Sequence, residues 1–129
     1  HGKGRVLVMD DEQAVSEVVC AMAKRLGYTA VAVPDGQTAL DVYALAAGTA
    51  AAFDVVVMDL TVPGGMGGKE AVTRLLDRFP DARVVVSSGY SDDAAMSNYE
   101  AYGFVGAIAK PYTIQELSEV LYPFSREGD

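Results

Sequence analysis

Apolar residues gather along the chain in five short runs, each followed by a stretch in which apolar side chains recur every three or four residues. Nearly continuous runs are typical of strands buried on both faces of a sheet, and the longer spacing is typical of amphipathic helices. The predicted strands are residues 5–10, 28–33, 54–59, 82–88 and 104–110. The pattern therefore predicts five pairs of a strand and a helix.

The predicted helices are bounded by residues that commonly start or stop helices. The second helix closes on Gly48 and the third on Pro80. Residues 91–103 indicate a short fourth helix, and the last helix begins with a capping box formed by Thr113 and Glu116. Strands joined by right-handed helical crossovers give a doubly wound α/β sheet with helices on both faces.

The bulk composition limits the classes of function. The chain has 129 residues, half of them apolar and 22% charged, which fits one globular domain. No apolar run approaches the ~20 residues of a membrane span, so no membrane contact is expected. The formal net charge of -8 disfavours direct binding to nucleic acid. Cys20 is the only cysteine, so no intrachain disulfide can form and the cytoplasm is the expected location.

The predicted domain covers residues 5–125. Residues 1–4 are interpreted as a vector-derived remnant and residues 126–129 as a tail. The chain shows no internal repeat and no low-complexity segment.

Polar side chains stand at the carboxyl ends of the predicted strands. Asp10 and Asp11 follow the first strand, Asp59 the third, Ser88 the fourth and Lys110 the fifth. These ends meet at the edge where doubly wound sheets bind ligands. A single acid at such an edge is usually just solvated, but three carboxylates brought together repel one another and favour a cation. All-oxygen ligands with room for water favour Mg²⁺.

The same edge carries groups suited to phosphoryl chemistry. Two hydroxyls, Ser87 and Ser88, close the fourth strand. A serine hydroxyl and the Lys110 ammonium would stabilise the charge on a transferring phosphoryl group. Asp59 is then the nucleophile that forms an acyl phosphate. The glycine-rich residues 64–68 would let the backbone approach and rearrange beside it.

Four motifs in this order resemble the receiver domain of two-component response regulators: DD after the first strand, MDLTVP after the third, SSG after the fourth and KP after the fifth. The resemblance covers the chain from Arg5 to about Phe124. It implies a flavodoxin-like fold with strand order 2-1-3-4-5. It also implies that Asp59 is the phosphoacceptor and that Lys110 pairs with the phosphoryl group.

The resemblance assigns roles to four further residues. Asp10 and Asp11 would hold Mg²⁺, together with Asp59 and the backbone carbonyl of Thr61. Ser88, rather than Ser87, would be the switch hydroxyl, because the family places a small residue directly after it, here a glycine.

The chain departs from the family pattern in two places. The loop PGGMGG after the third strand is one residue longer than usual and lacks an acid. Ala107 stands where an aromatic switch residue is common, so we expect activation to change mainly residues 64–68 and 89–93, with Tyr90 as the nearest ring that could substitute. The glycine loop is similar to that of receivers attached to hybrid sensor histidine kinases.

The sequence is therefore interpreted as a phosphorelay receiver that takes a phosphoryl group from phosphohistidine on a histidine kinase or histidine phosphotransfer domain, as part of a hybrid kinase. A free-standing response regulator and a phosphorylation-independent interaction module remain alternatives, and a weak homodimer is left open. A phosphatase of the haloacid dehalogenase type is disfavoured, because Thr61 occupies the position of its general acid. A flavin nucleotide would be repelled by the acids after the first strand.

Overall fold

A computed structural model describes residues 2–89 and 93–126 of the chain. It contains five strands: β1 (Gly4–Met9), β2 (Tyr28–Val33), β3 (Val55–Asp59), β4 (Val84–Ser88) and β5 (Gly106–Ala109). They form one parallel sheet in the order β2-β1-β3-β4-β5, which confirms the predicted fold class and strand order.

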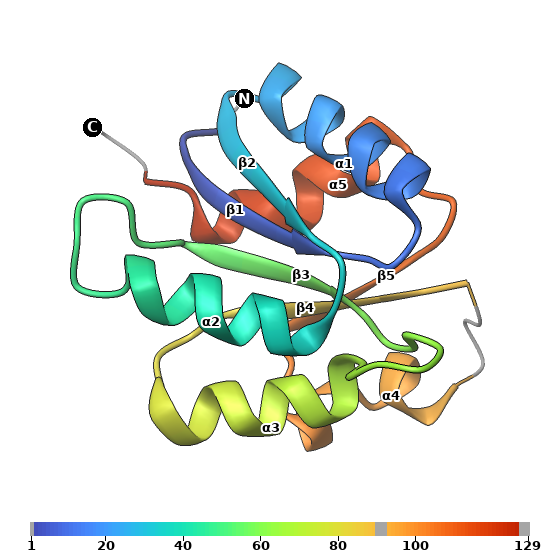
Figure 1. The fold of residues 1–129 in the computed structure, drawn as a ribbon. Helices are drawn as coiled ribbons and strands as arrows, with labels where there is room; N and C mark the ends of the chain where they lie inside the picture. The colour runs from blue at the N-terminus through green and yellow to red at the C-terminus, as the bar shows by residue number, and fades with distance from the viewer. Residues whose placement is uncertain (1, 90–92, 127–129) are drawn as a thin grey trace.

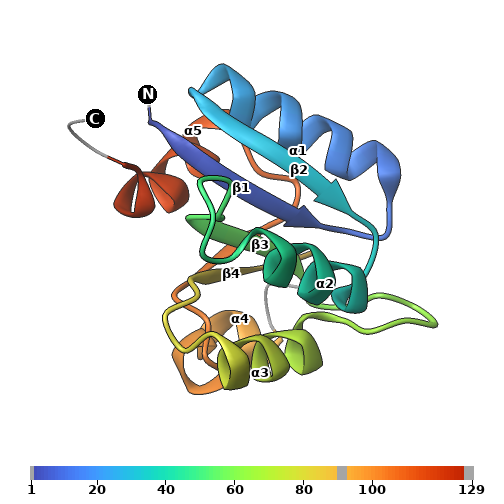
Figure 2. The same cartoon turned by 60° about the vertical axis from the view of Figure 1, so that its left-hand side comes forward.

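Helices cover both faces of this sheet (Figure 1). On one face lie α1 (Gln13–Arg25) and α5 (Ile114–Leu121), and on the other lie α2 (Gly36–Ala46), α3 (Gly68–Arg78) and α4 (Ala94–Ser97). The turned view separates the same two layers (Figure 2). None of the helices in the described ranges has the length and hydrophobicity needed to cross a lipid bilayer.

The sheet separates two apolar cores because side chains alternate between its faces. In β1, Leu7 and Met9 pack into the core beneath α2 and α3, whereas Val6 and Val8 pack into the core beneath α1 and α5. All four side chains are at most 2% exposed. This two-sided burial is the reason that the strands were apolar without interruption.

The fourth helical segment differs from its prediction. Within the described part of this segment, residues 93–103, the α-helix covers Ala94–Ser97 alone, and a 3-10 turn over Tyr99–Tyr102 follows it. Asn98 interrupts the helix with φ -127° and ψ 47°, outside the helical region. Asparagine side chains compete for backbone hydrogen bonds and so favour such breaks. The capping box of the last helix is confirmed.

Candidate functional site

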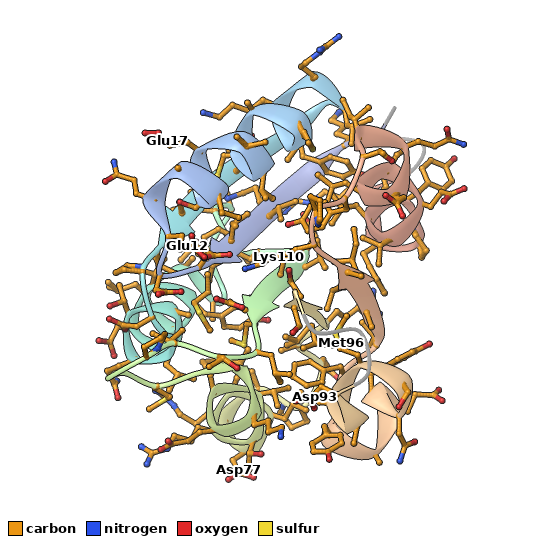
Figure 3. All side chains as sticks on the ribbon, turned by 90° about the vertical axis from the view of Figure 1, so that its right-hand side faces the viewer. Glu12, Glu17, Asp77, Asp93, Met96 and Lys110 are labelled. Atoms are coloured by element: carbon orange, nitrogen blue, oxygen red, sulfur yellow. The ribbon has the colours of Figure 1, made fainter. Side chains whose placement is uncertain are left out.

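Strand register brings the predicted acids together. Met9 of β1 pairs with Met58 of β3, so the next residues, Asp10 and Asp59, lie side by side at the carboxyl edge of the sheet. Both side chains are buried, and Asp11 is exposed beside them. One carboxylate oxygen from each of the three acids lies within 4.8 Å of the others. Figure 3 looks onto this edge, with Lys110 near its centre.

Lys110 links two of these acids. Its Nζ lies 2.6 Å from Asp10 Oδ2 and 3.3 Å from Asp59 Oδ1. Burial alone would lower the pKa of Lys110, but its hydrogen bond to Asp10 and the charge of Asp59 outweigh burial and raise it. The ammonium is therefore charged at physiological pH and sits next to the predicted nucleophile.

Asp59 is in an unfavourable place for a negative charge. Burial raises its pKa to about 6; the Lys110 ammonium opposes this shift, and Asp10 and Asp11 add to it. The negative charge of Asp10 is better stabilised, because its Oδ1 accepts a hydrogen bond from the Glu12 backbone amide at 2.9 Å. A further cation would therefore stabilise the Asp59 carboxylate most directly.

The acids fit a Mg²⁺ ion by their chemistry and spacing. Oxygen ligands of an octahedral Mg²⁺ are about 3 to 4 Å apart, and the three carboxylates offer oxygens within 4.8 Å of one another. Hard oxygen donors are the ligands that Mg²⁺ prefers.

An open cleft of about 400 Å³ lies above the acids. Its lining brings together most of the residues predicted from sequence: Asp11, Asp59, Thr61, Ser88 and Lys110. Ser88 is 3% exposed and lies at the end of β4. Of the other lining residues, Pro63 and Gly89 belong to the motifs quoted above but were given no role at the site, and Glu12 was not selected from the sequence. The run of three acids at residues 10–12 was the available signal for Glu12.

The glycine loop after β3 is shaped by close packing more than by backbone freedom. A Cβ at Gly67 would lie 2.6 Å from the Leu60 carbonyl oxygen, and one at Gly68 would lie 2.9 Å from that of Asp59. Only Gly64 in this loop has a positive φ, of 75°. The loop is also tied to α2, because the Gly36 amide donates to the Met66 carbonyl at 2.8 Å.

The predicted switch region is described in part. Ala107 is partly buried and packs against the core beneath α2, α3 and α4. Asp93 caps α4 and its Oδ1 lies 3.8 Å from Lys69 Nζ. Tyr90, the ring considered as a substitute for an aromatic switch, lies outside the described residues.

Comparisons with known proteins agree with this geometry. The family model for the response regulator receiver domain matches residues 6–122. The chain is 30% identical over 128 residues to sensor kinase CckA of Brucella abortus, covering 99% of this chain and 13% of that protein. It is 24% identical to sporulation initiation phosphotransferase F of Bacillus subtilis, covering 91% of this chain and 90% of that protein.

Solved structures give the same fold. The chemotaxis protein CheY4 of Vibrio cholerae superposes with a TM-score of 0.81 at 23% identity, covering 92% of this chain and 96% of that one. At this identity the likeness concerns the fold alone.

Proposed function

The chain belongs to the response regulator receiver domain family of two-component systems, and from this premise we propose that Asp59 accepts a phosphoryl group in a Mg²⁺-dependent reaction. One observation carries the proposal: a buried carboxylate at the end of β3 contacts Lys110 at 3.3 Å and lies within 4.8 Å of two more acids, under an open cleft. Few structural roles require so much like charge in one place.

Each residue of the site has a separate role in the proposed phosphoryl transfer. An Asp59 carboxylate oxygen bonds to phosphorus while the bond from phosphorus to the donor nitrogen breaks, and its electron pair stays on the donor imidazole. The Lys110 ammonium, which contacts Asp10 and Asp59 in the unphosphorylated protein, would also bind a phosphoryl oxygen. The Ser88 hydroxyl would donate to another, and the position of Ser88 in the lining of the cleft supports this role. Asp10, Asp11, Asp59 and the Thr61 carbonyl would hold Mg²⁺, which would supply the remaining positive charge.

We propose a phosphohistidine as the natural donor, on a histidine kinase or a histidine phosphotransfer domain. The match to a sensor kinase supports this partner, as does the glycine loop at residues 64–68, and both favour a hybrid kinase as the parent protein. The coverage of phosphotransferase F supports the second candidate, a free-standing receiver. The full reading frame decides between them, because a kinase core upstream would exclude the free-standing form.

A small phosphodonor tests the proposal without knowledge of the partner. Acetyl phosphate and Mg²⁺ should add one phosphoryl group, seen by intact mass, because the acceptor, Lys110 and the metal ligands all belong to this chain. Asp59→Asn should abolish the adduct. Asp77→Asn is the matched control, since Asp77 is an exposed acid on α3 and lies away from Lys110 (Figure 3). Equal adduct in parent and Asp59→Asn protein would remove Asp59 from the proposed role.

A further inference from the structure

The edge of the sheet holds a hydroxyl that the chemistry above does not use. Ser87 is the register partner of Asp59 on the neighbouring strand. Their side chains leave the same face of the sheet, on strands about 4.8 Å apart. That face is the one beneath α1 and α5, because Val57 and Val85, two residues earlier in each strand, belong to its core. Ser88 points to the opposite face by the same alternation.

Ser87 is buried and unpartnered. It is 2% exposed, and among the described residues its Oγ is the one buried side-chain oxygen or nitrogen with no hydrogen-bond partner. Its backbone is fixed, since the Ser87 carbonyl accepts from the Leu60 amide at 2.9 Å. A buried hydroxyl without a partner is unfavourable compared with an apolar side chain of similar size. A role in the chemistry of its neighbour Asp59 accounts for its presence.

The Tyr112 hydroxyl approaches Ser87 from the same core. Tyr112 is 9% exposed and packs beneath α1 and α5. Burial raises the pKa of Tyr112 to about 12, the Ser87 hydroxyl opposes this shift, and the charges of Asp10 and Asp59 add to it. The effect of Ser87 on the pKa of Tyr112 indicates that the two hydroxyls lie near each other, although Ser87 Oγ makes no hydrogen bond within the described residues. A neutral phenol can donate to Ser87 Oγ and leave the serine proton for a further acceptor.

We infer that rotation of the Ser87 side chain brings its hydroxyl to donate a hydrogen bond to the Asp59 carboxylate, that Tyr112 is a positioning residue that then donates to Ser87, and that this pair sets the lifetime of the acyl phosphate. The inference rests on the proposed function and adds a control on how long the phosphoryl group stays. In hydrolysis, a water oxygen bonds to phosphorus and the bond from phosphorus to Asp59 breaks. The electron pair returns to the carboxylate, and the water protons leave with inorganic phosphate or to solvent.

A hydrogen-bond donor beside Asp59 affects the rates of phosphorylation and of hydrolysis differently. Its hydrogen bond is strongest when the carboxylate carries a full charge and weaker in the acyl phosphate. It therefore stabilises the leaving carboxylate as hydrolysis proceeds, and it makes the same carboxylate a slightly weaker nucleophile in phosphorylation. Removing the hydroxyl should lengthen the lifetime without slowing formation. A residue that merely supported the fold would slow both.

The test compares lifetimes after phosphorylation by phosphoramidate and Mg²⁺, followed by removal of the donor. Ser87→Ala should lengthen the lifetime about tenfold, the size expected for one hydrogen bond to a charged group. Tyr112→Phe should lengthen it by a smaller factor, and Ser87→Thr, which restores the hydroxyl, should return it toward the parent value. Val85→Ala is the matched control, because it thins the same core two residues away and should leave the lifetime unchanged.

A second readout uses the unphosphorylated protein. The ¹³C shift of the Asp59 carboxyl at pH 8 should respond to Ser87→Ala and not to Val85→Ala. An unchanged lifetime in Ser87→Ala, or equal slowing of both directions accompanied by a lower Tm, would overturn the inference. If the parent protein takes up no phosphoryl group while the ¹³C shift responds as expected, the contact stands and the proposed function fails. If neither responds, both fail.

Discussion

Asp59→Asn should stabilise the Mg²⁺-free protein at neutral pH, although it removes one partner of a salt bridge. The pKa of Asp59 is raised from 3.8 to about 6, mainly by burial, with Asp10 and Asp11 adding to the effect. The ionised carboxylate is therefore a cost to the folded state. Lys110 does not lose its charge partner in the variant, because its shorter contact, 2.6 Å, is to Asp10.

The magnitude follows from the difference in proton affinity. Each pKa unit, a tenfold change in proton affinity, corresponds to about 1.4 kcal/mol. The ionisation of Asp59 therefore costs the folded state about 3 kcal/mol. Relaxation around the open cleft reduces this to about 2 kcal/mol, which corresponds to an increase in Tm of about 8 °C for a domain of this size.

The pH dependence has a fixed sign. An acid whose pKa is higher in the folded state than in the unfolded state binds its proton more tightly when folded. Asp59 therefore lowers the free energy of unfolding as pH rises from 3.8 to about 6, and the full cost persists above that interval. The gain from Asp59→Asn should be largest at pH 7.5 and should shrink as the pH falls below 6.

Thermal melts of the parent and Asp59→Asn proteins, in chelator and in Mg²⁺ at several pH values, measure this effect. Mg²⁺ should raise the Tm of the parent more than that of the variant, because the cation supplies the missing positive charge. A lower Tm for Asp59→Asn in chelator at pH 7.5 would refute the reasoning. A gain that does not change with pH would refute its electrostatic origin.

Three further predictions concern the metal, the loop and the response to phosphorylation. Asp11→Asn should weaken Mg²⁺ binding in calorimetry with little loss of Tm, because Asp11 is exposed; unfolding of this variant in Mg²⁺-free buffer would contradict that. Gly67→Ala should lower the Tm, since its Cβ would lie 2.6 Å from the Leu60 carbonyl oxygen, whereas an unchanged Tm would show that the loop yields easily. Beryllofluoride, a phosphoryl mimic, should change hydrogen exchange mainly in residues 64–68 and 89–93 and at Gly36, which is bonded to the loop; a large change throughout β5 would indicate a different switch.

Much of the fold could be predicted because the sheet is buried on both faces. Burial of this kind requires continuous apolar strands, and their alternation with helical patterns leaves few topologies. The helix at residues 91–103 was predicted too long, because its apolar positions are compatible with a helix while Asn98 breaks it locally. A single residue of intermediate helix propensity gives a weak signal in a sequence.

The sequence predicted which residues form the site, but it predicted only some of the contacts between them. The positions of Asp10, Asp59 and Lys110 follow from strand ends, which a pattern can locate. The distinct roles proposed for Ser87 and Ser88 depend on the face of the sheet from which each side chain projects, and only the register with Asp59 shows this face. The bond between Gly36 and Met66 joins distant segments and has no periodic signal. Contacts of this kind require the structure.

The central claim is that Asp59 carries the phosphoryl group, and chemical mapping of the adduct tests it most directly. Borohydride reduces an acyl phosphate to an alcohol, so treatment of the phosphorylated protein marks the modified acid permanently. Peptide mass spectrometry should then find the reduced side chain at position 59 alone, and only when both phosphodonor and Mg²⁺ were present. Reduction at Asp10 or Asp11 instead, or none at all, would contradict the account.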